Sequence, residues 1–459
     1  MRKIFLYGPP ASGKTTLGKA LAEALGWRFA DTDEMVVMAT GSNISNIFAN
    51  QGEAYFRERE SEALVKACDL EGNWVVALGG GTLLKEENRA LAEKSGEIIC
   101  LEAPSAKELA ERIAAGGSSR PLGDKAKERA AHYASFKVRL ARYFLLDGST
   151  VIVGNGLACA IVQDEHIVAD ENVDRLYPDF VKEAVFVMPS GEEFKTPQMI
   201  MEMWSAFAQA GIGRKDRVVA VGGGVTGDMT GFAAATWMRG IGWINVPTTL
   251  LSMVDASTGG KTGCDLPEGK NLAGAFHSPR LVIVDTEFLK TLPPEVLRCG
   301  LAEMIKHAAI GGKATWGTPP TAAEIAENLA VKVGIVREDP FETKGRRILL
   351  NCGHTIGHAV EKASNYQLSH GEAVAIGCVE EAKLAVRLGL ADDKWVDEFA
   401  AAFKAADLPT ELPAGMTLEG LVEIMRQDKK RAGTAVTFTL PCGWGDVRPV
   451  KLDLAQALP

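Results

Sequence analysis

The first residues whose types and spacing suggest chemistry form a glycine-rich loop near the N-terminus. The segment Gly8-Pro9-Pro10-Ala11-Ser12-Gly13-Lys14-Thr15 fits the pattern G-x-x-x-x-G-K-[ST]. Glycines let backbone N–H groups wrap a phosphate, and the N-terminus of a following helix adds a favourable dipole. Lys14 would reach the β- and γ-phosphates of a nucleotide, and the Thr15 hydroxyl would coordinate Mg²⁺. An apolar run precedes the loop and helical spacing follows it, so the sequence predicts a nucleotide phosphate site.

A histidine cluster in the last third of the chain suggests metal chemistry. The chain has only 7 histidines, and His354, His358 and His370 stand close together. Glu303 lies in another expected helix. Two histidines and one glutamate are a common catalytic zinc set that leaves one coordination position open for substrate. Spacing alone leaves open which of the histidines would be ligands.

Carboxylates, glycines and cations elsewhere in the chain suggest binding of further polar groups. Asp31 and Asp33 alternate after an apolar run, so one could face a metal and the other a substrate hydroxyl, although a surface turn fits equally well. Gly222-Gly223-Gly224 follows another apolar run, which suits a pyrophosphate site or a tight turn. Several cations beside apolar or glycine-rich sequence suggest an anionic substrate: Arg239, Lys261, Lys270, Lys306, Lys332 and Arg347.

The elements that must position these residues alternate between strands and helices. Apolar runs at 3–7, 74–78 and 97–101 predict strands, with helical spacing at 15–25. This alternation is typical of an α/β fold with a parallel sheet. The strand pattern restarts at Asp147-Gly148 and gives way to helical spacing after about residue 290. We therefore expect three units, at 1–147, 148–290 and 291–459.

Length, charge and cysteine usage limit the classes of protein to be considered. The chain has 459 residues, enough for roughly three domains of about 150 residues. With 50 Lys and Arg against 59 Asp and Glu, the net charge of −9 argues against general nucleic-acid binding. The 8 cysteines form no C-x-x-C pair, and no apolar run is long enough for a membrane span or a signal peptide. We expect a cytoplasmic protein that binds neither nucleic acid nor membrane.

The N-terminal unit resembles shikimate kinase. The resemblance is carried by the phosphate loop, Asp31-Thr32-Asp33, Gly52-Glu53 with Phe56-Arg57, Leu78-Gly79-Gly80-Gly81 and Arg120-Pro121-Leu122. It implies phosphorylation of shikimate to shikimate 3-phosphate by ATP with Mg²⁺, in a P-loop kinase domain. The implied magnesium residues are Thr15 and Asp31, and Asp33 is the implied catalytic residue. The implied ATP site comprises Gly8, Ser12, Gly13, Lys14, Thr15, Thr16 and Arg120. The implied shikimate site comprises Asp33, Arg57, Gly79, Gly80, Gly81 and a second arginine.

Two positions fit the second arginine, which in this family precedes a tyrosine by four residues. Arg129 precedes Tyr133, and Arg139 precedes Tyr143. Arg129 implies a short lid, whereas Arg139 implies a lid of normal length and no C-terminal kinase helix. The short distance to the next expected strand favours Arg129. In either case the final kinase helix is missing or replaced.

The remainder of the chain resembles 3-dehydroquinate synthase. The matching segments are Gly222–Asp228, Gly231–Ala234, Pro247–Ser257, Gly259–Gly263, Gly269–Leu272, Ala302-Glu303, Asn351–His358 and His370–Glu372. The resemblance implies conversion of 3-deoxy-arabino-heptulosonate 7-phosphate to 3-dehydroquinate with loss of phosphate. It also implies a Rossmann-like NAD-binding subdomain over 148–290 and an all-helical metal- and substrate-binding subdomain over 291–459.

The same resemblance assigns residues to the larger site. Glu303, His354 and His370 would hold Zn or Co, and His307 is left out of this set. Lys261, Lys306 and His358 would be catalytic. The implied NAD contacts are Asp170, Glu192, Lys195, Gly223, Gly224, Asp228, Thr248, Thr249, Asp255, Lys261 and Lys270. The implied substrate contacts are Arg239, Lys270, Asn271, Lys332, Arg347 and Asn351.

The sequence therefore predicts a bifunctional enzyme of the shikimate pathway that acts on small molecules and could form a homodimer through the synthase part. Two alternatives stay open. One is a different small-molecule kinase joined to a polyol dehydrogenase of related fold. The other is an active synthase that carries a degraded, non-catalytic nucleotide-binding kinase part.

Overall fold

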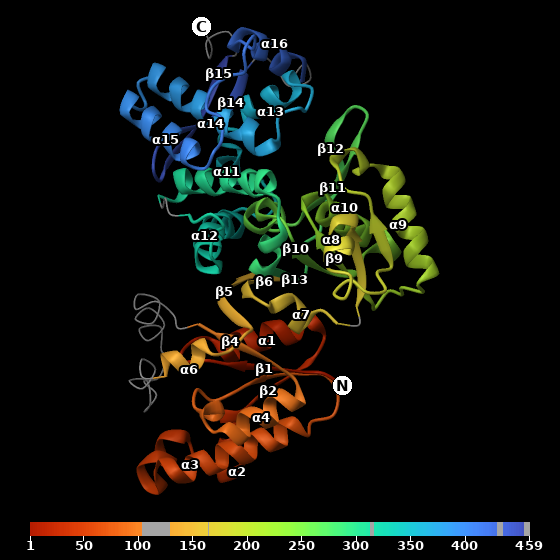
Figure 1. The fold of residues 1–459 in the computed structure, drawn as a ribbon, viewed down its shortest axis with the longest axis vertical. Helices are drawn as coiled ribbons and strands as arrows, with labels where there is room; N and C mark the ends of the chain where they lie inside the picture. The colour runs from red at the N-terminus through yellow and green to blue at the C-terminus, as the bar shows by residue number, and fades with distance from the viewer. Residues whose placement is uncertain (103–128, 164, 313–315, 429–434, 454–459) are drawn as a thin grey trace.

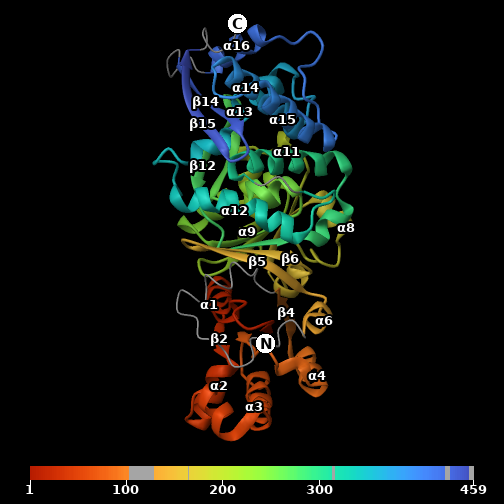
Figure 2. The same cartoon turned by 90° about the vertical axis from the view of Figure 1, so that its left-hand side faces the viewer.

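The protein is elongated, with its N-terminal part at one end and its C-terminal helices at the other (Figures 1 and 2). The computed structural model describes residues 1–102, 129–163, 165–312, 316–428 and 435–453. Within these ranges, no helix is both long and apolar enough to cross a membrane.

One sheet runs through both the N-terminal part and the middle of the molecule. Its eleven described strands lie in the order β2-β3-β1-β4-β5-β6-β13-β10-β9-β7-β8. Neighbouring strands are parallel, except that β5 and β6 pair antiparallel. In sheet order the bounds are Arg28–Asp31, Trp74–Ala77, Lys3–Tyr7, Glu97–Leu101, Arg139–Leu146, Ser149–Asn155, Leu281–Asp285, Gly242–Pro247, Arg217–Gly222, His166–Asp170 and Phe186–Met188.

The helices of the N-terminal part cover the strands β1 to β4. Helix α1 begins directly after the glycine-rich loop, because Gly13 takes a left-handed conformation with φ 93° and serves as its N-cap. The apolar face of α1 buries Leu17 and Leu21, as its helical spacing predicts. The helices here are α1 (Lys14–Leu25), α2 (Thr32–Thr40), α3 (Ile44–Cys68), η1 (Thr82–Leu84), α4 (Glu86–Ser95) and α6 (Ala130–Ala134).

The middle part places short helices around the second half of the sheet. A two-stranded hairpin, β11 (Lys261–Leu266) and β12 (Gly269–Phe276), projects beside it (Figure 1). The helices are α7 (Leu157–Ile161), α8 (Glu171–Leu176), η3 (Glu192–Phe194), α9 (Pro197–Gln209), α10 (Gly224–Thr236), η4 (Trp237–Arg239), the π-helical turn η5 (Ser252–Ala256) and η6 (Thr286–Thr291).

The C-terminal part is mainly helical, as expected, but it also contains a hairpin that the sequence analysis did not predict. Strands β14 (Ala435–Gly443) and β15 (Asp446–Asp453) pair antiparallel. In β14, Val436 is buried, and a continuous buried run follows from Phe438 to Pro441, so this strand packs closely within the C-terminal part. The helices are α11 (Pro294–Gly311), α12 (Ala322–Glu338), η7 (Arg347–Asn351), α13 (His354–Ala363), α14 (His370–Arg387), α15 (Asp393–Ala405) and α16 (Leu418–Asp428).

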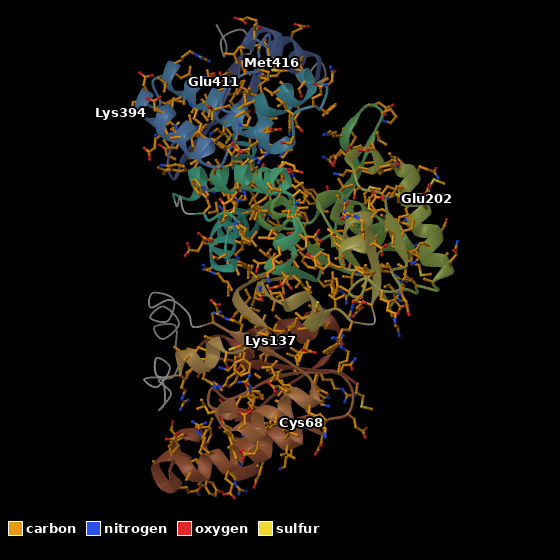
Figure 3. All side chains as sticks on the ribbon, in the orientation of Figure 1. Cys68, Lys137, Glu202, Lys394, Glu411 and Met416 are labelled. Atoms are coloured by element: carbon orange, nitrogen blue, oxygen red, sulfur yellow. The ribbon has the colours of Figure 1, made fainter. Side chains whose placement is uncertain are left out.

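The expected boundary at 147–148 falls in the two-residue turn that joins β5 to β6. Asp147-Gly148 is a favoured hairpin sequence, and Gly148 has a positive φ of 67°, a conformation that glycine adopts readily. Leu17 of α1 belongs to the same buried apolar cluster as Ile152 of β6 and Ile283 of β13. In Figure 3, Lys137, just before β5, is labelled within the N-terminal part, at the level of α1 and β4 in Figure 1. A single core therefore continues across the turn, and the two expected boundaries between the three units stay predictions.

The shared core predicts that the two sides of the β5–β6 hairpin lose stability together. Ile152 is fully buried, so Ile152→Ala should cost about 2–5 kcal/mol of the free energy of unfolding. Amide hydrogen exchange should become faster in β1 and β3 as well as in β9 and β10. Val65→Ala, at an exposed position of α3, should change little. Faster exchange on only one side of the hairpin would show that the two sides unfold independently.

Candidate functional sites

The glycine-rich loop leads from β1 into α1 and lines a cavity of about 390 Å³. The Lys14 ammonium donates to the carbonyl oxygens of Gly8 at 2.9 Å and Pro9 at 2.8 Å, so it lies over the loop. The Thr15 hydroxyl donates to Asp31 Oδ2 at 2.7 Å, which brings together the two residues expected at magnesium. Thr16 and Asp33 also line this cavity, and Ser12 is buried in the loop. Arg120, expected at the ATP phosphates, lies outside the described residues.

A second cavity of about 440 Å³ adjoins the first, and Asp33 lines both. Its wall includes the expected residues Arg57, Gly79, Gly80, Gly81 and Arg129. A Cβ at Gly81 would lie 2.6 Å from the guanidinium carbon of Arg57, so the glycine leaves room for that arginine.

The two candidates for the second arginine lie in different surroundings. Arg129 lines the second cavity together with Arg57, and the following helix is held over it because Tyr133 Oη donates to Gly80 O at 2.8 Å. Arg139 lies on β5 and pairs with Glu102 at 2.6 Å. The structure therefore places Arg129, and not Arg139, beside Arg57.

Glu60 is a residue of this cavity that the sequence analysis missed. Its carboxylate accepts a hydrogen bond from Arg57 at 2.6 Å and another from Thr82 at 2.8 Å. Burial raises the pKa of Glu60, while Arg57 opposes the shift. The only signal in the sequence is its position one helical turn after Arg57, which is also typical of an ordinary surface ion pair.

Glu303, His354 and His370 converge from three different helices. Glu303 lies within α11, while His354 and His370 are the first residues of α13 and α14. One ligand atom from each lies within 4.8 Å of the others. Glu303 Oε1 is 3.5 Å from His354 Nε2 and 3.3 Å from His370 Nε2. Residue spacing alone left open which histidines would bind a metal, and the resemblance implied His354 and His370. The structure brings these two histidines together with Glu303.

The chemistry of these three side chains fits a divalent cation. His354 Nδ1 lies 3.0 Å from the carbonyl oxygen of Cys352, which can only accept, so Nδ1 carries the proton and Nε2 directs a lone pair toward Glu303. His370 Nδ1 lies 3.6 Å from Glu361 Oε2, a carboxylate of the kind that orients histidine ligands. A zinc or cobalt ion would thus be held by one carboxylate oxygen and two imidazole nitrogens.

Two further histidines lie near this cluster. His358 and His370 form a second potential group with Glu361, and the rings of His354 and His358 have centroids 5.3 Å apart. His307, left out of the expected ligands, is fully buried with Nε2 3.6 Å from Asp255 Oδ1.

Buried lysines and carboxylates surround the histidines. Lys306 pairs with Glu303, and both side chains are fully buried. Lys332 donates to Asp255 Oδ1 at 2.5 Å. Although burial works against it, Lys332 and Lys306 hold the pKa of the Asp255 carboxyl well below its usual range. The cluster therefore holds fixed charges that could bind an anionic substrate next to a cation.

The expected NAD contacts gather where parallel strands end. The glycine triplet joins β9 to α10, Thr248 and Thr249 follow β10, and Asp170 ends β7. A Cβ at Gly222 would lie 2.7 Å from Asp170 Oδ2, so the carboxylate closely approaches the glycine-rich turn. Ligands bind at such carboxyl ends in open α/β sheets.

The remaining expected residues form ion pairs or hydrogen bonds at the edge of this site, or are exposed. Lys195 donates to Asp228 and to Asn271, each at 2.7 Å. Lys270 lies 3.9 Å from Glu192, and Lys261 lies 2.7 Å from Glu342. Arg347 is buried and donates to the carbonyl oxygens of Gly259 at 3.1 Å and Pro340 at 2.8 Å. Arg239 and Asn351 are exposed, and no described interaction joins them to the cluster.

Models of known protein families match most of the chain. The family model for the N-terminal part of 3-dehydroquinate synthase matches residues 185–299, and the model for its C-terminal part matches residues 300–431. The family model for shikimate kinase matches residues 10–155. The kinase match thus includes β5 and β6.

Individual relatives and solved structures agree with the synthase match. A 3-dehydroquinate synthase of Synechococcus is 42% identical over 306 residues, which cover 61% of this chain and 83% of the relative. That of Xanthomonas axonopodis pv. citri is 43% identical over 304 residues, 62% of this chain and 81% of the relative.

Among solved structures, a 2-epi-5-epi-valiolone synthase from Streptomyces hygroscopicus subsp. jinggangensis, with NAD⁺ and Zn²⁺ bound, is 26% identical with a TM-score of 0.60. The match covers 70% of this chain and 98% of that one. A 2-deoxy-scyllo-inosose synthase shares the fold, with a TM-score of 0.61 and 24% identity over 69% of this chain and 98% of that one. From these matches, the chain belongs to the 3-dehydroquinate synthase family and carries a shikimate kinase domain ahead of the synthase part.

Proposed function

We propose that the two sites catalyse two separate reactions of the shikimate pathway. The N-terminal site transfers a phosphoryl group from ATP to shikimate, giving shikimate 3-phosphate. The larger site converts 3-deoxy-arabino-heptulosonate 7-phosphate to 3-dehydroquinate with loss of phosphate. The synthase relatives and the kinase family match support this pair of activities. Pairing of two chains through the synthase part stays a prediction.

The observation that carries the kinase assignment is the position of Asp33 between two cavities. One cavity is bounded by the phosphate loop, and the other by Arg57 and Arg129. Arginines bind carboxylates such as that of shikimate with paired hydrogen bonds. Asp33 then lies where a substrate hydroxyl would meet the phosphoryl group, and it could accept the hydroxyl proton. Thr15 and Asp31 would hold Mg²⁺, which neutralises phosphate charge during transfer.

The synthase assignment depends on the convergence of Glu303, His354 and His370 beside the ends of the parallel strands. A divalent ion at these residues would polarise the substrate hydroxyl, and NAD at the glycine-rich turn would take up and return a hydride. Lys306, Lys332 and Arg347 bind and orient the anionic substrate. As phosphate leaves, the proton is taken by its own oxygens or by His358, whose ring centroid lies 5.3 Å from that of His354. This assignment favours the synthase over a polyol dehydrogenase, which would release NADH.

The two sites predict two separable activities. Lys14→Ala should abolish shikimate phosphorylation, because it removes the cation that binds the transferred phosphate, and should leave phosphate release from the heptulosonate nearly intact. His370→Ala should have the opposite effect, because it removes one side chain of the candidate metal set. Both activities should be measured on the same preparations of the full chain. Loss of both from a folded single variant would contradict the assignment of two independent sites.

The positions of Arg129 and Arg139 predict different effects on shikimate. Arg129→Ala should weaken shikimate binding by about 2–5 kcal/mol, as expected when a buried partner charge is left unpaired. Arg139→Ala removes a partly exposed ion pair with Glu102 and should change shikimate binding far less. Titration of both variants with shikimate measures the difference. A larger effect of Arg139→Ala would move the carboxylate site to β5.

Metal removal should separate the two reactions chemically. Chelation should abolish synthase activity, and Zn²⁺ or Co²⁺ should restore it, because Glu303, His354 and His370 offer nitrogen and oxygen ligands that suit those ions. Kinase activity should return with Mg²⁺ alone. Absorbance during synthase turnover should show no net NADH. Full synthase activity after complete metal removal, or steady release of NADH, would contradict the proposed reaction.

A further inference from the structure

Tyr143 lies on β5, the strand through which the kinase and synthase parts share one sheet. On one side β5 pairs parallel with β4, with Leu140 opposite Leu101. On the other side it pairs antiparallel with β6, where Tyr143 faces Ile152. The sequence analysis considered Tyr143 only as the tyrosine that follows Arg139, and gave it no role of its own.

The Tyr143 side chain reaches the phosphate loop. It lines the same cavity as Gly13, Lys14 and Thr15. A Cβ at Gly13 would collide with the Tyr143 hydroxyl oxygen and would lie 3.0 Å from its Cε1 atom. Gly13 is the N-cap of α1, so the phenol group lies beside the first backbone N–H groups of this helix. Those N–H groups have no partner within the helix and form the part of such a loop that binds phosphate.

A bulge in β5 determines the direction in which Tyr143 points. Leu140 lies opposite Gly154 and Arg142 lies opposite Val153, so Ala141 is an extra residue in β5. Side chains of a strand alternate between the two faces of a sheet, and one extra residue moves every later side chain to the opposite face. The bulge therefore sets the face on which Tyr143 lies.

The synthase part holds this strand in place. Arg337 of α12 donates to the carbonyl oxygen of Leu145, two residues after Tyr143. The same helix carries Lys332, which binds Asp255 in the synthase site. Together with the β5–β6 pairing, this contact fixes β5 from the synthase side.

We propose that Tyr143 is a nucleotide-contacting residue of the kinase site, supplied by a strand that the synthase part anchors. Its hydroxyl donates a hydrogen bond to a phosphate oxygen of the nucleotide held by the loop. A phenol hydroxyl is a good donor to an anionic oxygen, and such charge-assisted bonds are stronger than neutral ones. This inference rests on the proposed kinase function and extends it to a residue that no motif identifies.

Titration of the full chain with MgADP tests the contact, using Tyr143→Phe. Phenylalanine keeps the ring and removes only the hydroxyl, so the fold should be retained. MgADP binding should weaken roughly 10-fold, the loss expected for one hydrogen bond to a charged group. The KM for ATP should rise to a similar extent, with a smaller change in kcat and none in the KM for shikimate. Synthase activity should be unchanged.

Tyr177→Phe is the matched control, because it also removes one hydroxyl, which lies 2.6 Å from Thr291 Oγ1 on the synthase side. It should leave MgADP binding unchanged. If Tyr143→Phe bound MgADP as tightly as the unaltered protein, or more tightly, the proposed role of Tyr143 would be wrong. The proposed kinase function would not be affected by that result. If the unaltered protein bound no MgADP, and its titration did not differ from that of Lys14→Ala, the proposed kinase function would fail. This inference would then fail with it.

Discussion

The antiparallel hydrogen bonding between β5 and β6 is the constraint on which the rest of the molecule depends. Each strand would otherwise end a parallel sheet with a row of unpaired backbone groups, an arrangement that favours aggregation. Pairing them joins two smaller sheets into one of eleven strands in the described chain. It also lets α1, which opens with the phosphate loop, contribute to the same apolar core as β6 and β13. The kinase site and the synthase site are therefore built on one continuous framework.

The two sites use buried charge in different ways. In the kinase domain Lys14 contacts backbone oxygens, and Arg57 is paired with Glu60, so both cations are held where a phosphate and a carboxylate would arrive. In the synthase part Lys306 and Glu303 are fully buried, and Lys332 is buried beside the partly exposed Asp255. Burying charges costs free energy that pairing only partly returns, so such clusters are weak sources of stability. Their concentration at one place fits a site that binds an anion and a cation together.

The sequence was most informative where residue type and local spacing define the chemistry. The phosphate loop could be predicted because it depends on a few neighbouring positions. The assignment of Asp31 to magnesium, and of His354 and His370 rather than His358 to the metal set, came from the resemblance to the two families, because residue spacing left those alternatives open. The sequence could not show that β5 and β6 would merge two sheets, since strand pairing between units depends on long-range packing. Tyr143 was missed for the same reason, because its direction follows from a bulge at Ala141. The hairpin β14–β15 was missed because the burial of its residues depends on packing against elements elsewhere in the chain.

The central claim is that this framework carries two working active sites. The most direct measurement is an assay of both reactions on one purified preparation of the full chain. It would follow shikimate-dependent formation of ADP and release of phosphate from 3-deoxy-arabino-heptulosonate 7-phosphate. The account predicts both activities from the same protein, with shikimate 3-phosphate and 3-dehydroquinate as products. Synthase activity without phosphorylation of shikimate, in a protein that still binds MgADP, would contradict it and would identify the N-terminal domain as a non-catalytic nucleotide-binding module.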